Sequence, residues 1–98
     1  MTTENNKIIS EFLGNKPSNN GLYTINGKTT RPSELIYHSD WNWLMKVVEK
    51  ILSLSIELDT MDKYYDIIDR IPNIEAVYKE CINFIKEYNS IKYLISES

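Results

Sequence analysis

The sequence contains a single cysteine, Cys81, and a single histidine, His38, among its 98 residues. One cysteine cannot form a disulfide within the chain, and such cysteine usage is typical of proteins in a reducing compartment. Structural and catalytic zinc sites both need several nitrogen or sulfur ligands, which one histidine and one cysteine cannot supply alone. We therefore expect neither a metal site nor a cofactor.

Long apolar runs are also missing. No hydrophobic stretch approaches about 18 residues, so the sequence predicts no transmembrane helix and no membrane partner. The first residues, MTTENNKIISEFLG, lack the basic region and the apolar run of a secretory signal. The sequence therefore indicates a cytoplasmic protein.

Basic residues do not dominate, because the net charge is −3. Direct binding of nucleic acid by neutralising phosphates is not expected. The sequence lacks a glycine-rich phosphate loop, zinc-ligand spacing and paired catalytic carboxylates. His38, Ser39 and Asp40 are the residue types of a hydrolase triad, but consecutive side chains diverge, whereas a triad converges from separate segments. Ser39 is better interpreted as a helix N-cap, and the chain as a non-enzymatic protein.

The N-terminal part predicts a helix and a hairpin. Apolar residues at helical spacing indicate a short helix over residues 3–13, which Gly14 ends. Asn26-Gly27 is a strong signal for a hairpin turn between strands near 22–25 and 28–31. Residues 33–38 suggest one helical turn.

The C-terminal part predicts a second hairpin between two helices. A helical apolar stripe runs over residues 40–53. Leu54, Ile56 and Leu58 then repeat at period two, which favours a half-buried strand near 54–59 and, after a turn, a second strand over 64–69. The alternative is one continuous helix over 40–69. Asn73 is the predicted N-cap of the last helix, on whose apolar stripe Cys81 would be a buried hydrophobe.

These elements predict a single α+β domain over residues 1–98, with frayed ends at 1–2 and 90–98. The expected order is helix–hairpin–helix–hairpin–helix. Its antiparallel four-stranded sheet would be layered with three helices, because each helix has one apolar stripe that must be buried.

Trp43, near the start of the helix predicted over residues 40–53, has two possible roles. Trp41 lies on the apolar stripe, whereas Trp43 is rotated from it by about 200°. An exposed indole is often an anchor for a protein partner. The other interpretation, which we favour, is that the N-terminal helix or residues 33–38 cover the ring.

An acidic stretch provides the second candidate feature. From Glu57 to Glu75 the chain carries six acidic residues against Lys63 and Arg70. Most such stretches are solvated surface, but an acidic patch can dock on a basic groove, including one that normally receives nucleic acid. The candidate partner-binding residues are Trp43, Glu57, Asp59, Asp62, Tyr64, Tyr65, Asp66 and Asp69.

Two stretches, YHSDWNWLMKVVEKI and IEAVYKECINFIKEYN, carry a resemblance to known proteins. They resemble segments of small uncharacterised proteins from Bacteroidota genomes and their phages, and the layout is similar to the wider phage ABA-sandwich group. The resemblance covers about a third of the chain and does not include residues 54–73. It implies a phage or prophage setting and a layered helix–sheet–helix fold, and it carries no catalytic residues.

The sequence thus favours a protein-binding accessory protein of a phage or mobile element. Its sharper form is an inhibitor of host defence, similar in action to an anti-CRISPR protein, which occludes the surface of a host or phage partner. One alternative is a small-ligand or nucleotide-binding module with a pocket lined by Tyr23, Tyr37 and Trp43. Another is a self-assembling structural protein or homodimer that pairs through a hairpin edge.

Overall fold

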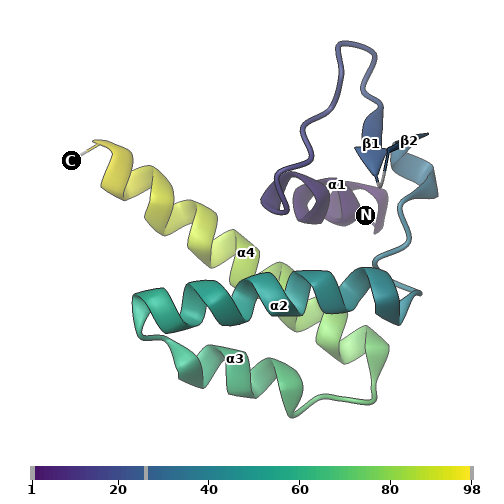
Figure 1. Ribbon diagram of the computed structural model, residues 1–98. Helices are drawn as coiled ribbons and strands as arrows, with labels where there is room; N and C mark the ends of the chain where they lie inside the picture. The colour runs from purple at the N-terminus through teal and green to yellow at the C-terminus, as the bar shows by residue number, and fades with distance from the viewer. Residues whose placement is uncertain (1, 26, 98) are drawn as a thin grey trace.

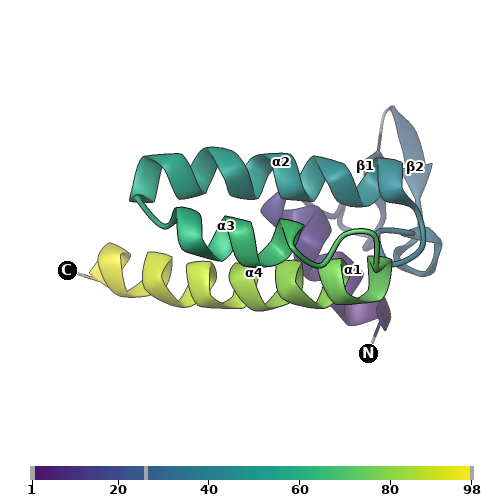
Figure 2. The same ribbon diagram turned by 90° about the horizontal axis from the view of Figure 1, so that it is seen from below.

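The computed structural model describes residues 2–25 and 27–97, with side-chain positions as far as Ile91. Its helices and strands are α1 (Thr2–Phe12), β1 (Tyr23–Ile25), β2 (Lys28–Thr30), a 3₁₀ turn (Pro32–Glu34), α2 (Trp41–Leu58), α3 (Met61–Ile68) and α4 (Ile74–Glu97). α3 packs beside both α2 and α4, α4 runs obliquely across α2 in the view of Figure 1, and α1 packs against α4 next to the small hairpin (Figures 1 and 2). The molecule is therefore mainly helical.

The predicted four-stranded sheet layered with three helices is wrong. The described residues contain four α-helices and one antiparallel sheet of two strands, β1 and β2. Residues 54–69, predicted as a second hairpin, form the end of α2 and the whole of α3. The break between these helices is at Asp59, which adopts a left-handed conformation with φ 56°. The Thr60 N–H donates to the Ser55 carbonyl at 2.9 Å, as in a Schellman motif that ends a helix.

The period-two pattern of Leu54, Ile56 and Leu58 wrongly predicted a strand, because the apolar residues at the end of α2 are not the buried ones. Ile56 and Leu58 are 65% and 48% exposed, whereas the polar Ser55 is fully buried. The buried residues of α2 keep helical spacing throughout and are Leu44, Val47, Val48, Ile51 and Ser55. The alternative of one helix over 40–69 is closer to the structure, although Asp59 and Thr60 divide it.

The N-terminal predictions agree better with the structure. α1 ends at Phe12, and Gly14 follows with φ +93°, a conformation that favours glycine. β1 and β2 pair with Tyr23 opposite Thr30 and Ile25 opposite Lys28. The predicted turn includes Asn26, which lies outside the described residues.

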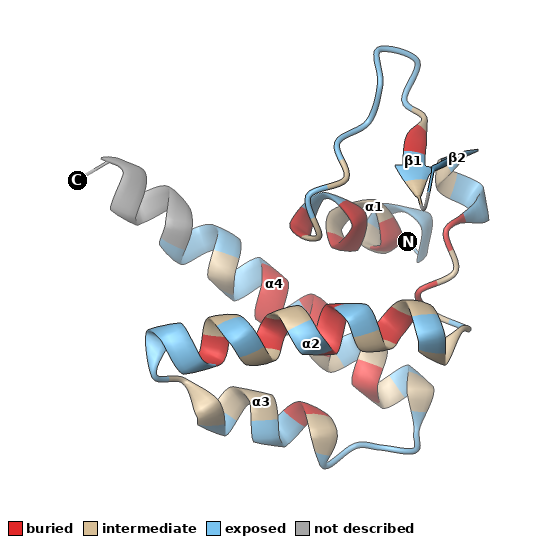
Figure 3. Ribbon diagram, viewed as in Figure 1, coloured by how far each residue is buried: buried red, intermediate tan, exposed pale blue. Residues whose placement is uncertain are grey.

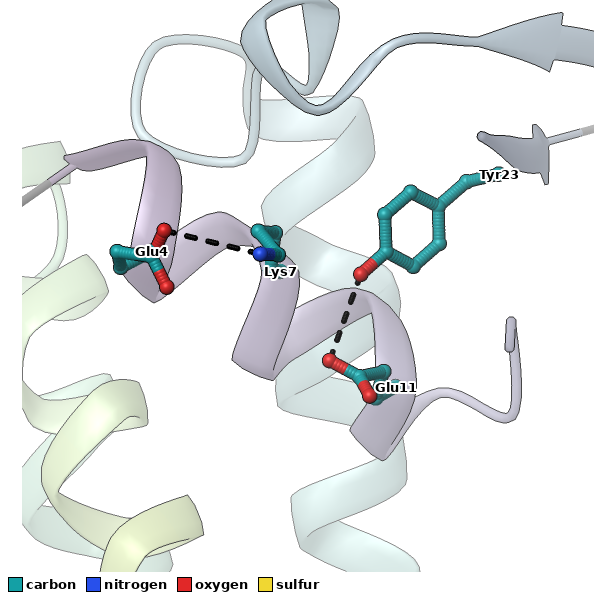
Figure 4. Close-up of polar contacts among 4 residues, drawn as sticks. All are labelled: Glu4, Lys7, Glu11 and Tyr23. Carbon is teal, nitrogen blue, oxygen red and sulfur yellow. Dashed lines mark hydrogen bonds and ion pairs between the residues drawn. The ribbon is translucent and has the colours of Figure 1, made fainter. Parts of the chain in front are cut away.

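The hairpin and α2 both hold α1 in place. The Tyr23 hydroxyl donates to the Glu11 carboxylate at 3.4 Å, on the face of α1 that also carries Glu4 and Lys7 (Figure 4). At the end of α1, the Lys50 ammonium donates to the Phe12 carbonyl and lies 4.7 Å from the centre of the Phe12 ring. Lys50 thereby satisfies a carbonyl that the helix leaves unpaired.

One hydrophobic core joins all four helices (Figure 3). Its buried members include Ile9, Leu44, Ile51, Ile67 and Ile85. The backbone of residues 90–97 belongs to α4, and Met1 and Ser98, at the predicted frayed ends, lie outside the described residues.

The helix caps correct one prediction and confirm another. Asp40, not Ser39, caps α2, because its Oδ1 accepts from the N–H groups of Asn42 at 2.8 Å and Trp43 at 3.3 Å. Asn73 caps α4 as predicted, accepting from the Ala76 N–H at 3.2 Å.

Asp40→Ala is expected to lower the free energy of unfolding by about 1 kcal/mol, because two N–H groups at the start of α2 lose their acceptor. Ser39→Ala, the matched control at an exposed neighbour, should change it by less than about 0.5 kcal/mol. Urea denaturation of both variants measures the difference. A larger loss in Ser39→Ala than in Asp40→Ala would contradict this capping assignment.

Candidate protein-binding groove

A groove of about 250 Å³ lies where α3 and α4 run side by side. We call it the α3–α4 groove. Its lining residues come from both helices and are Asp62, Lys63, Asp66, Ile67, Glu80, Asn83, Phe84 and Glu87. Figure 2 shows the two helices that form its walls.

Helical spacing places the polar residues along the two rims. Asp62 and Asp66 are one turn apart on α3, and residues at i and i+4 share a helix face. Glu80 and Glu87 are two turns apart on α4, with the same consequence. Ile67 is buried between the rims. The groove therefore has acidic rims above an apolar floor.

The charges of the groove are not balanced. Lys63 forms an ion pair with Glu87, which joins the two rims. No other ion pair within the described residues involves the groove, so Asp62, Asp66 and Glu80 are not paired with a basic side chain. Like charges at this spacing repel each other weakly, which is a cost that a cationic partner would remove.

An apolar notch adjoins the groove. It lies between the end of α2 and α4 and is lined by Leu58, Thr60, Lys63, Phe84, Glu87, Tyr88 and Ile91. Leu58 is 48% exposed and Ile91 is 49% exposed. The rings of Phe84 and Tyr88 stack with their centres 6.5 Å apart and an interplanar angle of 8°. The acidic groove thus continues into an exposed hydrophobic surface.

The eight residues that we predicted from the sequence to bind a partner do not all lie at the same place in the structure. Asp62 and Asp66 line the α3–α4 groove. Three acidic residues, Glu57, Asp59 and Asp69, are exposed nearby but do not line it. Tyr65 is 52% exposed, whereas Tyr64 is half-buried against the core.

Trp43 lies at a different place in the fold. Its ring meets the edge of Tyr37 at a centroid distance of 5.1 Å and an angle of 73°. The two rings border a hollow of about 190 Å³ that Leu13 and Ile25 also line. Residues 33–38 thus supply the neighbour that covers one side of the indole, and Trp43 does not border the groove.

Sequence reasoning did not include the α4 rim in the candidate surface. In the sequence, Glu80 and Glu87 are typical of the solvated polar side of the last helix, and Asn83 shows no distinguishing feature. Their i, i+3, i+7 spacing marks one edge of that helix, and this signal was present in the sequence. This spacing indicates the rim of a groove only when residues 61–68 are known to form a helix that packs beside this edge.

The single histidine and cysteine have structural surroundings. The Nδ1 atom of His38 lies 3.0 Å from the Nδ2 atom of Asn6. Cys81 is fully buried, as predicted, and burial raises its pKa to about 12. Within the described part of the chain, no group of three or more His, Cys, Asp or Glu side chains is placed to hold a metal ion.

Cys81 is expected to resist thiol reagents in the folded protein. Burial raises the pKa of the Cys81 thiol to about 12, well above the ordinary cysteine value of 9.0. Reaction with a disulfide reagent at pH 8 should be at least about 100-fold slower than in denaturant, because it requires unfolding or opening of the core. Equal rates in both conditions would show that the thiol is accessible.

The same pKa shift fixes the sign of the alkaline response. Between about pH 9 and 12 the unfolded chain releases the Cys81 proton that the folded chain retains, so stability falls as pH rises. Burial also raises the pKa values of Tyr23 and Tyr37, which act in the same direction.

None of the described helices is both long enough and apolar enough to cross a bilayer. The chain matches no protein-family model, no curated protein and no solved structure.

Proposed function

We propose that this chain is a non-enzymatic binding protein that docks its α3–α4 groove onto a basic surface of a protein partner. The observation that carries the proposal is the set of three carboxylates, Asp62, Asp66 and Glu80, that line one groove and form no ion pair within the described residues, since Lys63 of the same groove pairs with Glu87. Complementary charge speeds association and rejects partners of the wrong sign. Tyr65 adds exposed aromatic area beside the α3 rim.

The biological setting is part of the same proposal. The resemblance of YHSDWNWLMKVVEKI and IEAVYKECINFIKEYN to small proteins from Bacteroidota genomes and their phages supports an accessory protein that acts in the cytoplasm of a bacterial host. An acidic surface that covers a basic groove would block access of nucleic acid to that groove. This is one physical route by which such a protein would inhibit a host defence enzyme.

Capture from a bacterial host lysate tests this function when matched charge variants are compared. Wild-type protein should retain a partner at low salt, and retention should fall with rising ionic strength. Asp62→Lys combined with Asp66→Lys should abolish retention. Glu4→Lys combined with Glu49→Lys changes the net charge equally at exposed sites outside the groove and should preserve it.

Two results would reject the proposal. One is a folded wild-type protein that retains no partner at low salt. The other is equal retention by the groove variant and the control variant, because the groove would then have no part in binding.

The two alternatives have less support. The predicted ligand pocket does not form, because Tyr37 and Trp43 line a hollow of about 190 Å³, whereas Tyr23 lines a separate, wider hollow of about 690 Å³. The hollow beside Trp43 is smaller than ligand pockets of about 300 Å³ or more. Strands β1 and β2 have only three residues each, which gives a short edge for pairing two copies.

A further inference from the structure

We propose that the α3–α4 groove and the apolar notch together accept one amphipathic basic helix of the partner. This inference rests on the proposed function and adds the chemistry and secondary structure of the bound segment. The groove supplies the acidic part of the surface, and the notch supplies the apolar part.

The two parts form one continuous surface. Lys63, Phe84 and Glu87 line both the groove and the notch. Along α4 the surface extends from Glu80 to Ile91, which corresponds to about 16 Å of helix. An occupant that fills both parts therefore needs about three helical turns.

The walls favour a helical occupant over an extended one. α3 and α4 use their own backbone groups in helical hydrogen bonds, so neither wall offers a free edge for an added strand. An extended segment would leave its N–H and C=O groups without partners in the groove. A helix satisfies its own backbone groups and presents only side chains.

The charge and shape of the surface specify the side chains of that helix. Asp62 and Asp66 are separated by one turn, about 6 Å, which matches two basic residues at i and i+4 of a helix aligned with α3. Arginine fits best, because its guanidinium can bind a carboxylate through two N–H groups while its stem covers the Ile67 floor.

The notch selects a different residue. Its volume of about 30 Å³ admits only the end of one apolar side chain such as leucine. Leu58 and Ile91 leave half of their surface for that contact.

A synthetic helix tests this inference directly. The probe is a dye-labelled, alanine-based peptide of about 18 residues with leucine at i and arginine at i+7 and i+11, which share one helix face. Fluorescence anisotropy at low salt should show saturable binding to the full-length protein. A peptide of the same composition with the arginines moved to the opposite face should bind at least about tenfold more weakly.

Paired variants separate the two parts of the surface. Asp62→Asn with Asp66→Asn should weaken probe binding at least about tenfold, and Leu58→Ala should do so by about threefold or more. Controls are Glu49→Gln for a carboxylate and Ile56→Ala for an exposed apolar residue outside the notch. Circular dichroism confirms that each variant is folded, and both controls should bind within about twofold of wild type.

Each outcome decides a specific part of the account. Equal binding of the two peptides, or no binding of either, overturns the helix proposal. If the peptide fails while the charge variants still abolish partner retention from lysate, the helical occupant is wrong and the proposed function stands. If the partner is retained regardless of groove charge, the proposed function fails with it.

Discussion

Asn6→Ala is expected to lower the free energy of unfolding by about 3 kcal/mol. Asn6 is only 1% exposed, and its Nδ2 group donates to the Leu35 carbonyl at 2.9 Å and to the His38 Nδ1 atom at 3.0 Å. The Tyr78 hydroxyl donates to the Oδ1 atom of Asn6 at 3.0 Å. Alanine would leave the Leu35 carbonyl and the His38 Nδ1 atom without this donor, and the Tyr78 hydroxyl with only the longer contact of 3.4 Å to the Thr2 carbonyl. Each hydrogen bond lost at such buried or part-buried groups costs about 1 kcal/mol or more.

Chemical denaturation of Asn6→Ala beside Asn5→Ala measures this effect. Asn5 is the half-buried neighbour on the same helix, and its replacement should change stability by less than about 0.5 kcal/mol. Similar, small losses in both variants would show that the network around Asn6 does not stabilise the fold.

This network explains what the histidine does. His38 accepts a hydrogen bond at Nδ1, so its ring proton is placed on Nε2 in the neutral form. Through Asn6 and Tyr78, three distant segments are joined: α1, the residues before α2, and α4. No pattern in the residues indicates this connection, because an asparagine on the N-terminal helix is typical of exposed polar surface.

Trp43→Ala is expected to lower the free energy of unfolding by about 3 kcal/mol and to leave partner binding unchanged. The loss removes the edge-to-face contact with Tyr37 and the packing beside Leu13 and Ile25. Trp43→Phe, which keeps an aromatic ring, should recover about half of that loss.

Stability and partner retention must both be measured for the Trp43 variants. A loss of partner retention with an unchanged unfolding midpoint would mean that the indole is an anchor for the partner. It would also move the binding surface away from the groove.

Helix ends and the hairpin were predictable from the sequence where they depend on residues that are neighbours in the chain. Gly14 and Asn73 each mark a helix boundary at the right place in the chain, and β1 and β2 pair on either side of the predicted hairpin turn. The long helix was placed correctly at its start, although its cap is Asp40 rather than Ser39.

The segment over residues 54–69 failed because its structure depends on tertiary context. Asp59 takes a left-handed conformation that usually indicates glycine, so the sequence showed no helix end there. Ile56 stays exposed although it is apolar, which made helical surface look like the buried side of a strand. Only packing against α4 shows which side of α3 is buried.

The candidate site was predictable in its chemistry but not in its geometry. The acidic stretch pointed to Asp62 and Asp66, which line the groove. It could not show that Glu80 and Glu87 face them from α4, since that depends on α3 being a helix. Trp43 and the acidic residues were predicted to bind a partner for two unrelated reasons, an exposed indole and a negative charge. Neither reason implied that they lie at the same place in the fold.

The most direct measurement is amide hydrogen exchange of the full-length protein, free and bound to the partner recovered from lysate. We expect slower exchange on binding in residues 58–68 and 80–91, with no change near Trp43 or in the β1–β2 hairpin. Slower exchange confined to the Trp43 region or the hairpin, with residues 58–68 and 80–91 unaffected, would contradict it.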